Sequence, residues 1–436
     1  MAFCAQGALA ASYSVSNFAE LEAAAEAIGM AERAEGPEEF LLVLQDDIEC
    51  FYQLTIRNSV TIQGGGHRLV GKSAQEGLLY VEGRLLAEGL WFEGARGGAL
   101  QVDGFGAEGG LSAELIDCGF TGNQRGGAGG ALLVTAGGTR LTNCRFEGNE
   151  SGSMGGAAAL SGAAELERCD FAGNRAIEAG GALVCGALTL RDCGFEGNSA
   201  EQGGAVAVSG SIFAENGVFT GNTAQSGGGA ALFYGPVSLE RCSFIANHAL
   251  GENGRGGALA LLGGGALKAC GFTGNGAQSG AALWLNALPG GSTEYALLSG
   301  LFEGNSAGEG EAVVALGEGA GQVSLRVEGE NRFAQNQGAM ILGPANQPVE
   351  GGGSLVEEGG IPFSAEHGGA NGEGWYLVET GGGSLNLRAR PSAESAHCGK
   401  LARGGTVYVL GFEGNWAKIQ KGDQIVYAYG AYLKAR

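Results

Sequence analysis

Two carboxylates in neighbouring copies of an internal repeat, Asp170 and Asp192, are the residues of this sequence best suited to acid–base chemistry. They precede the same repeated Phe by one and by three positions, so in an extended strand their side chains point to the same side. Arg145 and Arg168 lie beside them at related positions of the repeat. Paired carboxylates with a neighbouring cation are what an enzyme needs to cleave a polysaccharide. Catalysis by Asp170 and Asp192 is therefore one hypothesis.

The other interpretation of these charges is structural. Opposite charges on neighbouring strands also form ordinary ladders of surface ion pairs. Between Gly97 and Gly383 the only lysine is Lys268 and the only histidines are His248 and His367, and these three share no repeat position. A basic lyase residue or an acid–base histidine thus has no obvious place. We expect a surface ladder and keep catalysis as the alternative.

Cysteines follow the repeat as well. Six of the ten occupy one repeat position, namely Cys118, Cys144, Cys169, Cys193, Cys242 and Cys270. This spacing differs from the paired Cys-x-x-Cys of metal sites, so we expect no metal and no cofactor. Buried thiols pack as small apolar groups, and we expect a column of free thiols inside the fold. Disulfides between neighbouring coils remain open, because the spacing of adjacent strands allows them.

The repeat that positions these residues has the signature Cys-x-Phe-x-Gly-Asn, with a degenerate early copy around Phe92. Later copies contain Phe120, Phe146, Phe171, Phe195, Phe219, Phe244, Phe272, Phe302 and Phe333. From Phe120 to Phe244 the intervals are 26, 25, 24, 24 and 25 residues, and they widen afterwards to 28, 30 and 31. A recurring period of this size is typical of a solenoid.

Short alternating runs between Gly and Asn turns, such as Ala205–Val208, predict strands, and no run in the repeat shows a helical period. About 24 residues with three short strands make one coil of a parallel β-helix, with coils ~4.8 Å apart. Cys and Phe are two residues apart and share the inward face, which predicts a stack of Phe rings. The Asn that follows predicts an amide ladder at a turn, where Gly permits positive φ.

Over about residues 60–345 this pattern resembles the repeats of polymorphic outer-membrane proteins and of the pectate-lyase-like, right-handed parallel β-helix superfamily. One copy of the pattern would be weak evidence for this resemblance, and the number of copies makes it specific. It implies the fold and a surface or secreted setting, and it implies no activity. We therefore expect an all-β protein with a right-handed parallel β-helix of about ten coils.

The N-terminal part predicts a cap for the solenoid. Asn17 to Glu20 form a capping box before a helix, and the runs Phe40–Leu44, Leu54–Ile56 and Val60–Ile62 would supply the first coil. Met1 to Ala11 is either the tail of a secretory signal or a plain chain end.

Closely spaced strand patterns begin at Leu385 and include Val407–Leu410 and Trp416–Ile419. They resemble a bacterial SH3-type domain, although Val426 stands where that family usually has Gly and Ala428 where it has a larger aliphatic residue. The resemblance implies a small β-barrel that attaches to a cell-wall peptide or polymer. The expected domains are 1–62 (cap helix and first coil), 63–345 (β-helix), 346–384 (closing coil and Gly-rich linker) and 385–436 (SH3-like barrel).

Alternation within Trp416–Ile419 places Ala417 and Ile419 inward and leaves Trp416 and Lys418 outward. The same alternation puts Tyr408 outward, and puts Tyr427 and Tyr429 together on one face. An exposed Trp beside such residues predicts a ligand-binding surface, with ordinary packing of a small barrel as the alternative. The predicted ligand residues are Trp416, Lys418, Tyr408, Tyr427 and Tyr429.

Charge separates the two parts of the chain. The net charge is −21, but from Leu385 onward eight Lys and Arg face three acidic residues, which leaves +5 there and −26 before it. We do not expect so acidic a chain to bind nucleic acid, because negative charges repel each other. No stretch of the sequence approaches the ~20 apolar residues that a membrane-spanning helix needs.

We expect an extracellular or cell-surface bacterial protein that binds cell-wall polymer, peptidoglycan or another glycan and displays a rigid β-helix. The alternative is an extracellular polysaccharide lyase or glycoside hydrolase.

Overall fold

The structure is a computed structural model. It describes residues 11–31, 40–73, 75–104, 110–308, 311–317, 321–342, 349–350, 354–358, 374–378, 385–392, 395–401, 406–413, 416–421, 424–429 and 432–435. Most of Met1–Ala11, and His367, thus lie outside the described residues. The chain forms two compact units, residues 1–225 with 230–232 and residues 226–229 with 233–436.

Short parallel strands wind into a β-solenoid of about 13 turns, and a small antiparallel sheet lies near the C-terminus. The predicted all-β class is confirmed, and the predicted count of about ten coils was too low. Coils before Phe92 lack the Phe of the signature: Leu69 pairs in register with Phe92, and Ile48 with Leu69. An aliphatic side chain fills the same inward position without leaving a readable repeat.

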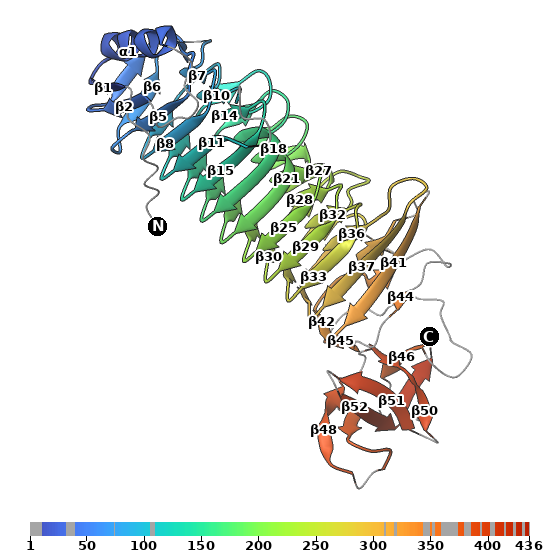
Figure 1. The fold of residues 1–436 in the computed structure, drawn as a ribbon. Coiled ribbons are helices and arrows are strands. Elements are labelled where there is room, and N and C mark those ends of the chain that lie inside the picture. Colours follow the sequence, from blue (N-terminus) through green and yellow to red (C-terminus); the bar gives the residue numbers. More distant parts are fainter. Residues whose placement is uncertain are drawn as a thin grey trace. The chain divides into compact units, whose positions relative to one another are not determined.

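The first unit begins with β1 (Ala11–Val15) and α1 (Phe18–Met30), which is the only α-helix in the described part of the chain. Asn17 Oδ1 accepts a hydrogen bond from the Glu20 amide at 3.1 Å, and Glu20 Oε2 accepts one from the Ser16 amide at 2.7 Å, so the predicted capping box is confirmed. Leu21 and Ile28 are buried, and Figure 1 shows α1 across the N-terminal end of this unit. No helix among the described residues is long and apolar enough to cross a membrane.

Three parallel sheets build the coils of the first unit. One sheet contains two strands in most coils, and in two coils a single long strand, β18 or β21, takes both places. Besides β1, its strands in this unit are β2 (Phe40–Leu44), β4 (Leu54–Ile56), β5 (Val60–Gln63), β7 (Leu79–Val81), β8 (Leu85–Glu88), β10 (Leu100–Val102), β11 (Leu111–Ile116), β14 (Leu132–Val134), β15 (Gly138–Thr142), β18 (Ala158–Glu167), β21 (Leu183–Arg191), β24 (Val206–Val208) and β25 (Ile212–Glu215). The pairing of β2 with β5 places Phe40–Leu44 and Val60–Ile62 in successive coils, and not together in one first coil.

The second sheet carries the Phe of the signature. Its strands in this unit are β3 (Ile48–Cys50), β6 (Arg68–Gly71), β9 (Trp91–Glu93), β12 (Gly119–Thr121), β16 (Arg145–Glu147), β19 (Asp170–Ala172), β22 (Gly194–Glu196) and β26 (Val218–Thr220). The third sheet has β13 (Gln124–Arg125), β17 (Glu150–Ser151), β20 (Arg175–Ala176) and β23 (Ser199–Gln202). Two strands, β27 (Thr223–Gly227) and β28 (Ala231–Phe233), lie where the chain passes from one unit to the other.

Identical side chains stack along the axis, as the repeat predicted. From Phe92 to Phe219, consecutive rings lie 4.6–4.9 Å apart with interplanar angles of 3–6°. At the following turn, Nδ2 of each Asn donates to Oδ1 of the Asn in the next coil, at 2.9–3.0 Å from Asn123 to Asn222. The Gly before each Asn has positive φ, for example 62° at Gly173.

Coils of the second unit repeat this arrangement. Their solenoid strands are β29 (Val237–Glu240), β30 (Ser243–Ile245), β31 (His248–Ala249), β32 (Leu259–Leu261), β33 (Gly265–Lys268), β34 (Gly271–Thr273), β35 (Gly276–Ala277), β36 (Leu283–Leu285), β37 (Ser292–Leu298), β38 (Leu301–Glu303), β39 (Ser306–Ala307), β40 (Ala312–Leu316), β41 (Gln322–Glu328), β42 (Glu330–Ala334), β43 (Ala339–Leu342), β44 (Val349–Glu350) and β45 (Ser354–Glu358). Rings from Phe244 to Phe333 stack at 4.4–5.0 Å.

The thiols of the signature are buried, and their Sγ atoms donate to backbone carbonyls. Neighbouring cysteines are in contact along the axis: the Cys144 amide donates to Cys169 Sγ at 3.4 Å, and the Cys169 amide donates to Cys193 Sγ at 3.3 Å. These cysteines therefore form the predicted internal column.

Candidate ligand-binding face of the C-terminal module

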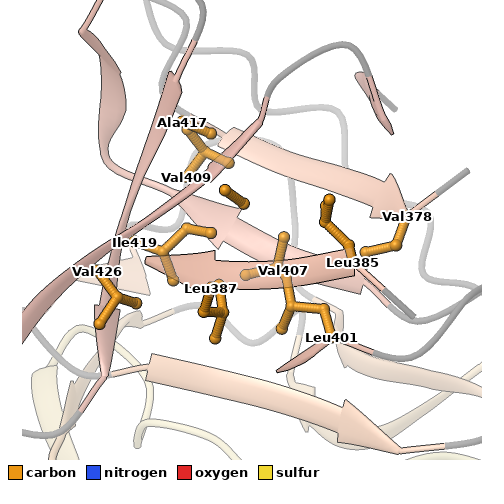
Figure 2. Close-up of a cluster of buried hydrophobic side chains, with 10 residues drawn as sticks. Val378, Leu385, Leu387, Leu401, Val407, Val409, Ala417, Ile419 and Val426 are labelled. Atoms are coloured by element: carbon orange, nitrogen blue, oxygen red, sulfur yellow. The ribbon is translucent and has the colours of Figure 1, made fainter. Parts of the chain in front are cut away.

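The C-terminal module folds around its own small core. Its strands are β46 (Gly374–Val378), β47 (Leu385–Arg388), β48 (His397–Leu401), β49 (Thr406–Val409), β50 (Gly411–Glu413), β51 (Trp416–Lys421), β52 (Gln424–Tyr429) and β53 (Leu433–Ala435). Five of them form one antiparallel sheet in the order β48, β47, β52, β51, β50. Figure 2 shows the core against this sheet, with Leu387, Val407 and Ile419 among its residues.

Alternation along β51 and β52 sorts inward from outward side chains. Ala417 and Ile419 are buried in the core, and so are Val426 and Ala428 of the neighbouring strand. Val426 and Ala428, the two departures from the family pattern, thus both serve as core residues. The predicted inward positions of β51 are confirmed, which leaves the residues between them on the opposite, outward face of the sheet.

On that outward face, Trp416 pairs directly with Tyr429, and Lys418 pairs directly with Tyr427. The rings of Trp416 and Tyr429 meet edge to face, with centroids 5.3 Å apart. Tyr429 in turn lies 6.1 Å from the ring of Tyr432, which is exposed. We call Trp416, Tyr429 and Tyr432 the aromatic face.

Polar groups border the aromatic face. Glu413 of β50 pairs directly with Trp416, and its Oε1 lies 3.5 Å from Lys418 Nζ. The Tyr427 hydroxyl donates to the same Oε1 at 3.3 Å. The pKa of Tyr427 is raised, first by partial burial and then by the negative charge of Glu413, so its hydroxyl remains a donor at neutral pH. Flat rings beside a donor, a cation and a carboxylate suit a ligand with both apolar surfaces and hydroxyl groups.

Four of the five predicted ligand residues, Trp416, Lys418, Tyr427 and Tyr429, come together on this face. Tyr408 lies in β49, and its side chain is outside what the structure describes. Sequence reasoning missed Glu413 and Tyr432. For Glu413 a signal was present: Gly-Asn between Glu413 and Trp416 is typical of a two-residue hairpin turn, which places these two residues opposite each other.

The two candidate catalytic carboxylates occupy different columns of the solenoid. Asp170 pairs in register with Arg145 in one neighbouring coil and with Gly194 in the other. Asp192, two residues before Gly194, lies at a corner with φ of 53°, where its Oδ1 accepts a hydrogen bond from Asn216 Nδ2 at 2.8 Å.

Both arginines of the catalytic hypothesis contact other acidic residues. Arg145 lies 3.0 Å from Glu147, and Arg168 is paired with Glu167. Arg168 Nε also donates to Asn143 Oδ1 at 2.7 Å. Both ion pairs join residues of the same coil. Ion pairs between neighbouring coils occur elsewhere on the solenoid surface, as between Arg140 and Glu165 at 2.9 Å. Within the described ranges, no three His, Cys, Asp or Glu side chains are grouped so that they could hold a metal ion.

Comparison with known proteins assigns only the C-terminal module. Its residues 383–434 match the family model of the bacterial SH3 domain. No curated protein matches the chain. Two solved structures are similar to it: the L. reuteri 53608 SRRP, with 13% identity and a TM-score of 0.29 over 79% of this chain and 99% of that one, and the bacteriophage CBA120 tailspike protein 3, with 10% identity and a TM-score of 0.33 over 83% and 63%.

The family match agrees with the observed strands and with the predicted domain. The chain therefore consists of a parallel β-solenoid of about 13 turns and, at residues 383–434, a bacterial SH3 domain.

Proposed function

We propose that this is a non-catalytic binding and display protein of the bacterial cell surface. Its SH3 domain attaches to a cell-wall polymer or peptidoglycan, and its solenoid is the rigid part presented to the surroundings. The observation that supports this most directly is the aromatic face, in which the ring of Tyr429 contacts those of Trp416 and Tyr432 outside the core. Aromatic side chains in contact on the outer surface of a small domain mark a site of interaction.

Attachment explains why the charges of the chain are divided. Repulsion would keep an acidic solenoid away from an anionic wall, whereas a module with a charge of +5 is attracted to it. An extracellular or cell-surface location follows from the proposed ligand. Rigidity of the displayed part follows from the stacked Phe rings and Asn amides, which repeat the same contacts in coil after coil.

Co-sedimentation with purified Gram-positive cell walls tests the proposal. We expect the full chain to bind, and we expect Trp416→Ala to weaken binding at least about tenfold, a loss of ~1.4 kcal/mol, because truncation removes the largest ring of the face. Phe213→Ala is a suitable control, since Phe213 is a half-exposed aromatic residue of β25 in the solenoid.

Binding that is equal for the wild type and Trp416→Ala would exclude the aromatic face as the attachment site. Loss of binding in the Phe213 variant instead would assign attachment to the solenoid. Near-ultraviolet circular dichroism of each variant verifies that the module remains folded.

A further inference from the structure

The outward side of the five-stranded sheet continues beyond the aromatic face onto β47 and β48. Arg388 of β47 pairs directly with Tyr427 of β52 on one side and, across a β-bulge, with His397 of β48 on the other. Tyr427 pairs in turn with Lys418. Directly paired residues of antiparallel strands lie on the same face, so one row of side chains crosses β47, β52 and β51, and the exposed His397 of β48 lies beside its end.

Lys400 lies on this face too. It pairs directly with Asn386, and both side chains are exposed, whereas Leu387 and Leu401 of the same two strands are buried in the core. Arg388 and Lys400 therefore form a cationic edge beside the aromatic face, and His397 lies next to Arg388.

Positive charge at this edge is not neutralised within the described residues. Arg388 donates through a terminal guanidinium nitrogen to the Ser395 carbonyl at 2.9 Å, which is a neutral acceptor. In the described part of the chain no carboxylate is paired with Arg388, His397 or Lys400. Glu413 is on the far strand of the sheet, with Lys418 as its partner.

We propose that the cationic edge binds the acidic group of a saccharide whose sugar rings pack on the aromatic face. The inference rests on the proposed function and specifies its ligand as an anionic glycan, with a carboxylate or a phosphate as the charged group. A guanidinium pairs with either oxyanion through two parallel hydrogen bonds. Two strand spacings, roughly 10 Å, separate β47 from β51, which is on the scale of a short oligosaccharide.

Two soluble glycans that differ only in charge test whether an acidic group of the ligand is recognised. Polygalacturonate and its fully methyl-esterified form share a sugar backbone, and only the first is anionic. We expect the full chain to bind polygalacturonate at least about tenfold more tightly in calorimetry, and we expect added salt to remove the difference because it screens exposed charges. The double variant Arg388→Gln, Lys400→Gln should lose this preference and bind both probes equally.

Matched variants separate this inference from the proposed function. Lys434→Gln removes an exposed cation of β53, outside the five-stranded sheet, and should keep the preference. Arg388→Lys should keep part of it, since the charge remains. Trp416→Ala should weaken binding to both probes alike, because it removes ring packing and no charge.

A double variant that retains the full preference would overturn the cationic edge, while the Trp416 result would still decide the proposed function independently. An equal affinity of the wild type for the two probes would exclude a carboxylate as the acidic group. A wall phosphate would then be the other source of the negative charge. For that source, walls are compared before and after their phosphate polymers are removed with hydrofluoric acid. Wall binding that is weakened both by hydrofluoric acid and by the double substitution of Arg388 and Lys400 identifies phosphate as the acidic group. Wall binding that neither the acid nor the double substitution changes refutes the inference.

Discussion

Asn174 and Asn198 lie one above the other in successive coils, and Nδ2 of Asn174 donates to Oδ1 of Asn198 at 2.9 Å. The same nitrogen donates to the carbonyl oxygen of Phe146 in the preceding coil at 3.1 Å. Both Asn side chains are buried. One amide thus joins three coils, at a place where water cannot substitute for it.

Asn174→Ala should therefore be strongly destabilising. It removes the acceptor of the Asn149 amide and side chain and the donor to Phe146, and each unsatisfied buried group costs ~1–3 kcal/mol. We expect the free energy of unfolding to fall by about 3 kcal/mol or more in urea titrations. Gln202→Ala, which removes an exposed amide from the following coil, should change it by less than ~0.5 kcal/mol. Similar losses in both variants would contradict the ladder's role.

Backbone strain at one corner can be tested in both directions. Gly173 has φ of 62° with open space where a Cβ would lie, so Gly173→Ala should cost ~1–2 kcal/mol from its backbone alone. In the coil with Phe244 the corresponding residue is Ala246, with φ of 52°. Ala246→Gly should raise the thermal midpoint, because the relief of strain exceeds the entropy that Gly adds to the unfolded chain. A lower midpoint would contradict this reasoning.

Stability should depend on the ionisation of a buried thiol. Burial raises the pKa of Cys185 from its ordinary value of 9.0 to about 12. Between these values the unfolded chain binds fewer protons than the folded one, so the contribution of Cys185 is fully present below pH 9 and is lost as pH rises towards 12. The difference in thermal midpoint between the wild type and Cys185→Ala should shrink across this window. Parallel curves would show that Cys185 does not titrate differently in the two states.

Aromatic packing inside the solenoid should outweigh aromatic packing on its surface. Phe171 stacks on Phe146 at 4.7 Å and on Phe195 at 4.9 Å, and Phe171→Ala should cost ~3–5 kcal/mol by leaving a cavity. Phe213 lies outside, with the Arg191 guanidinium 5.2 Å from its ring, and Phe213→Ala should cost no more than ~1 kcal/mol. Denaturant midpoints of the two variants provide the comparison, and a reversed order would refute it.

Much of the solenoid could be predicted because the sequence repeats wherever side chains stack. The Phe, Cys and Asn columns each need the same residue type in every coil, so their positions are readable without coordinates. Early coils could not be counted, since Ile48 and Leu69 satisfy the same inward position by volume alone. One corner of the coils also could not be predicted. Its residues have positive φ although they are not glycines, as at Asp117, Asn143 and Arg168, and their types vary from coil to coil.

On the SH3 domain, alternation along one strand was enough to separate core residues from Trp416 and Lys418. The contact between Tyr429 and Tyr432 was not predictable in this way, because it depends on how the chain continues after β52. The cationic edge was also hidden, since it arises from pairing between strands that are far apart in sequence, such as Arg388 with Tyr427.

The amide ladder has a direction, and this bears on how such a protein could change in length. Each Asn donates forward to the next Asn and backward to a Phe carbonyl, so every internal coil offers its successor the same groups that it receives from its predecessor. At the N-terminal end of the ladder, Ala95 takes the Asn position and contributes only its backbone amide, which donates to Asn123 Oδ1 at 3.0 Å. Gain or loss of one whole coil by gene duplication or deletion would therefore leave every remaining amide with a partner. Coils of different length are also compatible with the ladder, which continues across Asn-to-Asn separations of 28, 30 and 31 residues after Asn247.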